Sequence, residues 1–326
     1  MHILILGAAG MVGRKLGARL AKDGALGGRK ITRAALHDVV MPAAPDGAPF
    51  PCSCHASDFS DAGEAAGLVA GKPDVIFHLA AIVSGEAEAD FDKGYRINLD
   101  GSYRLFEAIR AIGGGYKPRV VFTSSIAVFG APFPPRIGDE FLSAPLTSYG
   151  TQKAIGELLL NDYSRRGFMD GIGIRLPTVS VRPGTPNKAA SGFFSNIMRE
   201  PMAGLPAVLP VSDSVRHWHA SPRAAIGFLI HAATMDLARL GWRRNLSMPG
   251  LCVSVAEQIE ALRRVAGDAA AARIRREPDA VIDRIVAGWP QEFDTARARA
   301  LGFTPDADYD SVLRAHIEDE LGGKTA

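Results

Sequence analysis

A short apolar run followed by three regularly spaced glycines opens the chain. Residues 2–6 read HILIL, and glycines follow at positions 7, 10 and 13 within GAAGMVGRKL. The apolar run predicts a buried strand, and the residues from Met11 onward predict a helix that begins inside the glycine segment. Glycine allows a tight turn and a close approach between helix and strand. The start of the chain is therefore expected to be a strand–turn–helix unit.

Apolar strand segments continue to alternate with amphipathic helical segments up to about residue 181. The expected strands are KITRAALHD (30–38), CSCHASD (52–58), PDVIFHLAA (73–81), PRVVFTSS (118–125) and GIGIRLPTVS (171–180). The expected helices between them cover residues 11–24, 61–71, 92–113 and 148–167. This order predicts an α/β protein with a Rossmann doubly wound parallel sheet.

The pattern changes after Val181, where proline, glycine and short segments predominate. Further helices are expected over 221–235 and 253–267, with a strand between them at 245–250. We predict a dinucleotide-binding Rossmann domain at 1–176. A smaller, interleaved C-terminal substrate-binding domain is expected at 177–326, of which residues 223–250 return to the Rossmann sheet.

Composition limits the classes of partner. The 326 residues include 37 basic and 35 acidic side chains, and the mean hydropathy is +0.06. This balance gives no broad basic field for nucleic acid, and we find no signal peptide or membrane span, so a cytoplasmic protein is expected. The three cysteines make no disulfide framework, and neither Cys52 and Cys54 nor His217 and His219 has the further ligands that a metal site needs. We therefore predict no metal.

The glycine segment has the context of a phosphate-binding loop. Gly7 would make the turn, Gly10 would let the backbone approach a pyrophosphate, and Gly13 would let the helix pack on the strand. The free N–H groups of the helix start favour phosphate. Asp38, at the end of the second strand, would accept both adenosine ribose hydroxyls and repel a 2′-phosphate, which favours NAD over NADP. The alternatives are a purely structural turn and a loop cap at Asp38.

Two side chains suited to proton transfer lie one helical turn apart in SYGTQK. Tyr149 and Lys153 share a helix face, and a lysine ammonium there would stabilise a tyrosine phenolate. Ser125 ends the preceding strand at the edge where ligands bind in open α/β sheets. The three residues could remove a proton from an alcohol while a hydride leaves its carbon. A solvated helix face is the alternative interpretation.

The motifs together resemble an extended short-chain dehydrogenase/reductase of the epimerase/dehydratase branch. GAAGMVG, HASDFSD, FHLAA, NLDGS, TSSIAVFG and YGTQK occur in family order. The resemblance implies a catalytic set of Ser125, Tyr149 and Lys153, and a homodimer formed by the helices near 94–112 and 149–166. It implies that NAD is held by Gly7, Gly10, Met11, Val12, Gly13, Asp38, Asp58, Phe59, Leu79, Ala80, Ala81, Asn98, Tyr149, Lys153 and Pro177. Asn98 and His78 are also compatible with a purely structural role.

Within that family, the second half is similar to the D-erythronate dehydrogenase group. The segments that carry this resemblance are RLPTVSVRPG, TPNKAASGFFSNIMREPMAG and LPVSDSVRHWHASPRAA. It implies NAD-dependent oxidation of the C2 hydroxyl of a small sugar acid to the 2-oxo acid. The expected substrate contacts are Ser84, Ser125, Arg182, Asn187, Ser191 and Arg216. An arginine can pair a carboxylate with two hydrogen bonds; an internal salt bridge is the alternative for Arg182.

Two other functions stay open at this stage. A nucleoside-diphosphate-sugar epimerase or dehydratase would use the same catalytic set, and Arg216 could bind its diphosphate. Such enzymes usually carry an Asn near the position of Pro177, where this chain reads RLPTVSVRPG. An NAD(P)-sensing regulator would keep the fold without the chemistry, and the intact Ser125, Tyr149 and Lys153 argue against it.

Overall fold

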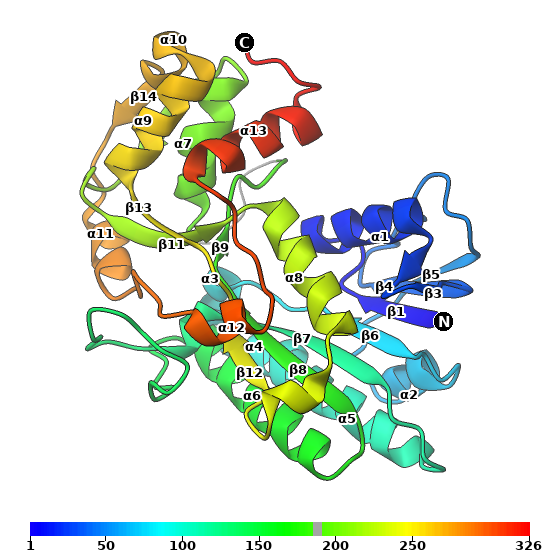
Figure 1. The fold of residues 1–326 in the computed structure, drawn as a ribbon. Helices are drawn as coiled ribbons and strands as arrows, with labels where there is room; N and C mark the ends of the chain where they lie inside the picture. Colours follow the sequence, from blue (N-terminus) through cyan, green and yellow to red (C-terminus); the bar gives the residue numbers. More distant parts are fainter. Residues whose placement is uncertain (185–190) are drawn as a thin grey trace. The chain divides into compact units, whose positions relative to one another are not determined.

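The structure is a computed structural model that describes residues 1–184 and 191–326. Contacts within the chain divide it into two compact units (Figure 1). The first unit contains residues 1–128, 147–175 and 226–246, and the second contains residues 129–146, 176–225 and 247–326. Residues 129–146, which the sequence analysis included in the dinucleotide-binding segment 1–176, have most of their contacts within the second unit.

The first unit is built on a seven-stranded sheet of order β12-β8-β7-β6-β1-β4-β5. Its strands are β1 (His2–Leu6), β4 (Arg33–Asp38), β5 (Cys52–Ala56), β6 (Val75–His78), β7 (Arg119–Ser125), β8 (Asp170–Leu176) and β12 (Asn245–Ser247). β1 pairs in parallel with β4 on one side and β6 on the other. The chain thus builds the sheet outward in both directions from β1, which confirms the Rossmann doubly wound sheet. Ligands bind at the carboxyl ends of the strands where such an order reverses.

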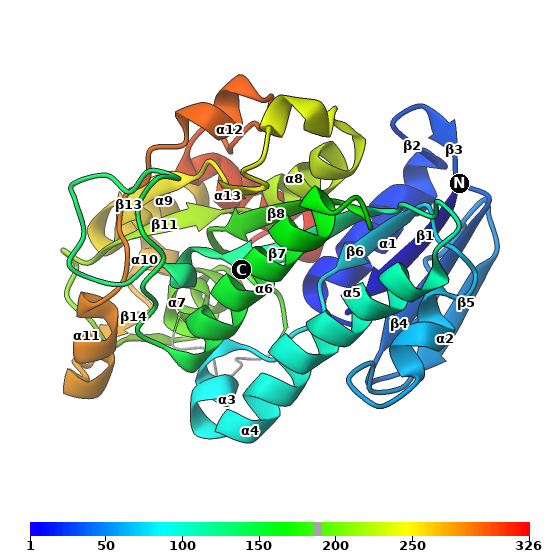
Figure 2. The ribbon, with the colours of Figure 1, turned by 90° about the horizontal axis from the view of Figure 1, so that it is seen from below.

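Helices cover both faces of this sheet (Figure 2). Leu4 and Leu6 pack in one cluster with Phe106 and Leu160 from two helices. Alternate residues of a strand point to opposite faces, and Ile3 and the other intervening residues of β1 are equally buried. The helices are α1 (Met11–Asp23), α2 (Glu64–Val69), α3 (Ser84–Ala89), α4 (Phe91–Gly94), α5 (Gly101–Ile112), α6 (Ser148–Arg165) and most of α8 (Pro222–Thr234), with short 3₁₀ turns at Ile126–Val128 and Leu237–Leu240.

Three predicted elements differ in detail from the structure. The expected helix 92–113 is divided into α4, a π-helix at Tyr95–Asp100, and α5. The expected strand 171–180 is divided into β8 and β9 (Thr178–Val179), which belongs to another sheet, because Pro177 has no N–H to continue a ladder. The expected strand from residue 30 begins only at Arg33, since the residues before it form a small hairpin, β2 (Ala25–Leu26) with β3 (Arg29–Lys30).

The second unit has its own apolar core. A three-stranded sheet of order β13-β11-β9 contains β11 (Arg216–Ala220) and β13 (Leu251–Ser254), and β10 (Ala207–Leu209) pairs with β14 (Ile274–Arg276). Its helices are α7 (Gly192–Met202), α9 (Val255–Ala266), α10 (Asp268–Ala271), α11 (Ala280–Ala287), α12 (Ala296–Ala300) and α13 (Tyr309–Glu320). Phe194, Met198, Leu209, Leu262 and Leu313 are fully buried within this core.

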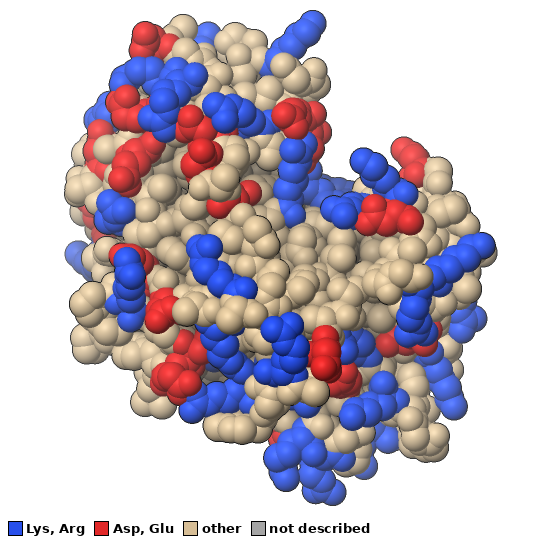
Figure 3. Space-filling view, viewed as in Figure 1, with Lys and Arg blue, Asp and Glu red and all other residues tan. Residues whose placement is uncertain are grey.

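Two surface properties bear on the class of partner. Acidic and basic side chains both occur across the face drawn in Figure 3, in keeping with the nearly balanced totals. Among the residues that the structure describes, no helix combines the length and the apolar character needed to cross a membrane.

Candidate active site

The glycine loop joins β1 to α1 with the backbone geometry that its sequence predicts. Gly7 has a φ of +87°, and a Cβ there would lie 2.7 Å from the Ala80 nitrogen. A Cβ on Gly13 would lie 2.1 Å from the Gly7 carbonyl oxygen. Gly10 differs, because its nearest neighbour would be 3.3 Å away and the residue is exposed. Packing therefore explains Gly7 and Gly13. At Gly10 a Cβ would make one tight contact, with the Gly7 carbonyl oxygen, and the residue is otherwise exposed.

Asp38 ends β4 beside this loop. One carboxylate oxygen accepts the Ala9 N–H at 2.9 Å, and the other accepts the Val39 N–H at 2.7 Å. The side chain thus caps local backbone, as the alternative interpretation expected. Each carboxylate oxygen has a second lone pair, so the group can also accept two ribose hydroxyls.

Asp58 and Phe59 follow β5, and the structure engages both side chains within the protein. Partial burial opposes ionisation of Asp58, but hydrogen bonds from Ser60 and Arg96 hold its pKa below the usual value. The Phe59 ring is buried and meets the His78 ring edge-on at 5.5 Å. What Phe59 offers to an adenine is therefore its backbone.

Asn98 connects the loop after β6 to α6. It is 2% exposed, and its side-chain oxygen accepts the Ile82 N–H at 2.9 Å. Its amide nitrogen donates to the Ile82 carbonyl at 3.3 Å and to the Gln152 side-chain oxygen at 2.8 Å. Asn98 lies in the π-helix, a local widening that is frequent at functional sites. It fixes the segment that follows the predicted cofactor residues Leu79, Ala80 and Ala81.

The predicted catalytic residues all lie in the first unit. Ser125 is the last residue of β7, and its hydroxyl oxygen accepts the Ala127 N–H at 3.1 Å. Tyr149 and Lys153 are in the first turns of α6, whose N-terminus is capped by the Thr147 side chain. The Lys153 Nζ lies 5.7 Å from the centre of the Tyr149 ring. Lys153 is 2% exposed, and this burial lowers its pKa to about 8, although Glu157 opposes the shift.

His78 serves the structure rather than proton transfer. Burial, with the Lys153 charge adding to it, lowers the pKa of His78 to about 3. The Ser102 hydroxyl donates to the Asn98 carbonyl at 2.7 Å, so His78 Nε2–H is the donor in the 2.9 Å bond to Ser102. The imidazole is therefore neutral at physiological pH, which agrees with the structural alternative for this residue.

The expected substrate residues of the second half lie in the second unit. Arg182 Nη2 donates to the Ser191 hydroxyl at 3.1 Å, so the structure brings these two together. Arg216 is 3.3 Å from a Glu257 carboxylate oxygen and donates to the Cys252 carbonyl. Asn187 lies outside the described residues. Pro177 separates β8 from β9, and Ser84 is the first residue of α3 in the first unit.

His217 and His219, considered as a metal pair and set aside, are buried in β11. His217 Nε2 is 2.7 Å from the Thr178 hydroxyl, and His219 Nδ1 is 3.2 Å from the Ser180 hydroxyl. Burial lowers the pKa of His217 to about 3. Both rings thus take part in side-chain hydrogen bonds between neighbouring strands.

The sequence analysis missed a buried charge pair next to Lys153. Glu157 of α6 pairs with Arg175 of β8, and their side chains are 4% and 8% exposed. The signal was present, because Glu157 continues the four-residue spacing of Tyr149 and Lys153 along the helix. The partner could not be read from the sequence, since Arg175 lies 18 residues farther along the chain.

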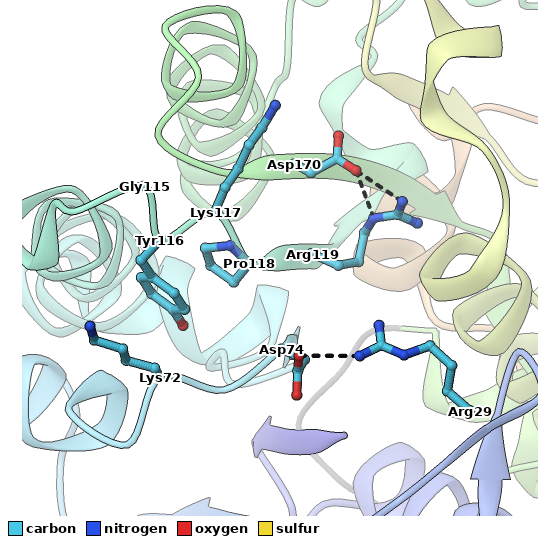
Figure 4. A pocket seen from close by; sticks show the side chains of 9 residues that line it. All are labelled: Arg29, Lys72, Asp74, Gly115, Tyr116, Lys117, Pro118, Arg119 and Asp170. Carbon is cyan, nitrogen blue, oxygen red and sulfur yellow. Dashed lines mark hydrogen bonds and ion pairs between the residues drawn. The ribbon is translucent and has the colours of Figure 1, made fainter.

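A separate pocket of about 390 Å³ lies at the amino ends of β6, β7 and β8, the opposite edge of the sheet from the glycine loop and Ser125 (Figure 4). Both of its carboxylates are engaged in ion pairs, Asp74 with Arg29 and Asp170 with Arg119. Its position at the amino ends of the strands separates this pocket from the candidate site at their carboxyl ends.

Known proteins resemble this chain over most of its length. The profile of the NAD dependent epimerase/dehydratase family matches residues 3–220. The D-erythronate dehydrogenases of Cupriavidus necator and Haemophilus influenzae are 48% and 40% identical to this chain, and each match covers 98% of this chain and 98% or 100% of the relative. The crystal structure of the nucleoside-diphosphate-sugar epimerase from Agrobacterium tumefaciens is 65% identical, with a TM-score of 0.97 over 99% of this chain and 95% of that one.

The matches cover the glycine loop, Ser125, Tyr149 and Lys153 within one continuous family region. This chain therefore belongs to the NAD-dependent epimerase/dehydratase family and is an oxidoreductase that works with a nicotinamide cofactor.

Proposed function

We propose that the protein oxidises the C2 hydroxyl of a small sugar acid, D-erythronate or a close analogue, to the 2-oxo acid with NAD. The observation that carries this proposal is the buried Lys153 ammonium beside Tyr149, one turn away on α6, together with the two relatives named D-erythronate dehydrogenase. The cofactor supplies the hydride acceptor when it is bound. The substrate class and the roles of the residues are our inference.

Each residue of the catalytic set has one task. Tyr149 takes the proton of the C2 hydroxyl as the C2 hydride leaves. Lys153 stabilises the phenolate through its charge and binds the nicotinamide ribose. Ser125 orients the reacting hydroxyl from the carboxyl end of β7.

The cofactor is held at the glycine loop and at the loops after the neighbouring strands. Gly7, Gly10 and Gly13, with Met11 and Val12 at the start of α1, receive the pyrophosphate. Asp38 binds the adenosine ribose, and the remaining contacts are proposed at Asp58, Phe59, Leu79, Ala80, Ala81, Asn98 and Pro177.

Gly10→Ala and Gly13→Ala should separate cofactor binding from folding. A Cβ at position 13 would meet backbone atoms at 2.1 and 2.7 Å, so the free energy of unfolding should fall by about 1–3 kcal/mol or more. A Cβ at position 10 would meet only the Gly7 carbonyl oxygen, at 3.3 Å, so Gly10→Ala should lose much less stability than Gly13→Ala and should bind NAD more weakly. Urea unfolding and NAD titration of both variants measure the contrast. Unchanged NAD affinity in Gly10→Ala would place the phosphates elsewhere.

Asp38 should decide the choice between NAD and NADP. We expect the wild type to prefer NAD in kcat/KM, because the Asp38 carboxylate accepts ribose hydroxyls and repels a 2′-phosphate. A charged hydrogen-bond partner is typically worth about 1.5–3 kcal/mol, so Asp38→Asn should reduce the preference by roughly tenfold or more. A wild-type preference for NADP would contradict the ribose assignment.

For the substrate carboxylate we propose Arg182 as the principal cation, with Ser191 beside it. The Arg182 guanidinium donates to the Ser191 hydroxyl, whereas the Arg216 guanidinium pairs with the Glu257 carboxylate. Ser84 and Asn187 are proposed as contacts of the substrate hydroxyls.

The direct test of the proposed function is an absorbance assay for reduced cofactor. Mixing the enzyme with NAD and D-erythronate should produce net NADH, and a panel of aldonates with different chain lengths should define the preferred substrate. No NADH with any sugar acid would reject the proposal.

A nucleoside-diphosphate-sugar epimerase is the second candidate, favoured by the name of the 65% identical structure. Its nicotinamide is recycled in each turnover, so it would convert a UDP-sugar without net NADH. Chromatography of UDP-sugars incubated with the enzyme therefore distinguishes the two functions.

We also propose a homodimer formed by the helices around residues 94–112 and 149–166. Tyr103 and Leu158 on these helices are 47% and 69% exposed, and such a dimer would cover them. Light scattering in solution should give twice the mass of the chain.

A further inference from the structure

A buried ion pair continues the catalytic stripe of α6. Tyr149, Lys153 and Glu157 follow one another at four-residue intervals and so share one face of the helix. Glu157 accepts hydrogen bonds from Arg175 Nε at 2.8 Å and Nη2 at 2.7 Å. Both charges of the pair are thus removed from water close to the catalytic lysine.

The Glu157 carboxylate also connects the helix to two strands. The Ser124 hydroxyl of β7 donates to the same carboxylate at 2.5 Å, and Ser124 directly precedes Ser125. Arg175 reaches Glu157 from β8. The fit between α6 and β7 is close, because a Cβ on Gly156 would lie 2.7 Å from the Phe122 ring. One side chain therefore fixes the register between the helix of Tyr149 and the strand of Ser125.

Stability alone gives little reason to keep charges at this position. Removing two ions from water costs several kcal/mol each, and apolar replacements of a buried ion pair are often as stable or more stable. The pair lies beside Lys153, whose charge the proposed reaction needs. The position of the pair beside Lys153 points instead to a role in that site.

The pair also sets the local charge. Lys153 and Arg175 are two buried cations, and Glu157 is one anion, so ionisation of Tyr149 brings the group to neutrality. Burial, with the Lys153 charge, keeps His78 of β6 neutral by lowering its pKa to about 3. On the side of β7, the Lys153 Nζ lies 5.0 Å from the centre of the Phe122 ring, which is uncharged. Gln152 of α6 and Asn98 of the π-helix, which are hydrogen-bonded to each other, add no charge to the group.

We propose that Glu157 and Arg175 are positioning residues of the catalytic set. Their ion pair holds the Tyr149–Lys153 face of α6 against β7 and sets the charge that ionised Tyr149 has to balance. This inference rests on the proposed function, in which the Tyr149 phenolate is the base.

The two members of the pair should shift the pH dependence in opposite directions. Glu157→Gln removes a negative charge, which favours proton loss from Tyr149 and moves the acid limb of kcat to lower pH. Arg175→Gln removes a positive charge and moves the limb to higher pH. At an effective dielectric constant of about 20, each shift should be about one pH unit. A purely structural role would lower activity or stability without opposite shifts.

Two further variants avoid leaving an unpaired buried charge, and so test the inference even if the single variants fold poorly. The double variant E157Q/R175Q leaves no unpaired buried ion and removes one charge of each sign, so the two shifts should largely cancel and its limb should lie close to that of the wild type. Arg175→Lys keeps the charge and should keep the wild-type limb with a lower kcat. Asp162→Asn is the matched control, since it removes a negative charge from an exposed ion pair of the same helix. This control should leave the limb unchanged.

A measurement without cofactor or substrate completes the test. Phenolate absorbance in the near ultraviolet, corrected with Tyr149→Phe, reports the ionisation of Tyr149 in the free protein. In each variant, the pH midpoint of this Tyr149 titration should shift in the same direction as the acid limb of the kcat profile. Suppose that Tyr149→Phe is inactive, as the proposed function expects. The inference is then overturned if the Tyr149 titration is unshifted in Glu157→Gln and Arg175→Gln, or if it shifts in the same direction in both. A fully active Tyr149→Phe would instead overturn the proposed function.

Discussion

Tyr149→Phe should lower kcat by about 10²–10⁴-fold, the usual effect of losing a general base. The substitution keeps the ring and its packing and removes only the oxygen that, as a phenolate, accepts the proton. Affinity for NAD should change little, because the phosphates are proposed to bind at Gly7, Gly10 and Gly13. Steady-state kinetics and a direct NAD titration measure the two effects separately.

The matched control for this variant is Tyr163→Phe on the same helix. The Tyr163 hydroxyl bonds Glu107, away from Lys153, so this loss should leave kcat nearly unchanged. If Tyr149→Phe retained the wild-type kcat, the proposed mechanism would have to be abandoned.

The pH dependence of kcat follows from the same two side chains. The rate should rise with pH as Tyr149 loses its proton, and this limb should be absent in Tyr149→Phe. Burial lowers the pKa of Lys153 to about 8, so the ammonium is present below that pH and is lost above it. The wild-type rate should therefore fall again above about pH 8. A rate that stays constant from pH 8 to the limit of enzyme stability would contradict a catalytic role for the Lys153 charge.

Arg182→Met should have the second large effect, on the KM for the acid. Removing one partner of a desolvated charge pair typically costs about 2–5 kcal/mol, which corresponds to a rise in KM of about 30-fold or more. Affinity for NAD should change much less, since none of the proposed phosphate contacts involves Arg182. Measuring KM for the acid and Kd for NAD in the same variant separates substrate binding from a general loss of structure.

Arg216→Met provides the comparison. Arg216 is half-exposed and already paired with Glu257, so its removal should alter KM only slightly. The reverse result, with a large effect at Arg216 and none at Arg182, would move the carboxylate site to Arg216.

The sequence by itself determined the parallel sheet and the order of its strands and helices along the chain. Strand runs such as HILIL are apolar on both faces, which is typical of a parallel sheet covered by helices. The glycine spacing and the four-residue interval between Tyr149 and Lys153 are local patterns, because a turn and a helix face are each set by neighbouring residues. For that reason the glycine loop, the end of β4 at Asp38 and the start of α6 could be predicted.

Only the tertiary structure decided which distant residues meet. The partners of Asn98 lie 16 and 54 residues away, and the partner of Glu157 lies on another strand. The π-helix interrupts a segment whose pattern predicts one continuous helix, and Asn98 within it bonds the loop after β6. Periodicity shows which face of an element is buried, but the identity of the opposing side chain depends on how the strands are ordered. The burial that lowers the pKa of Lys153 arises in the same way, since it comes from the helix packing on β7 rather than from the residues next to Lys153 in the sequence.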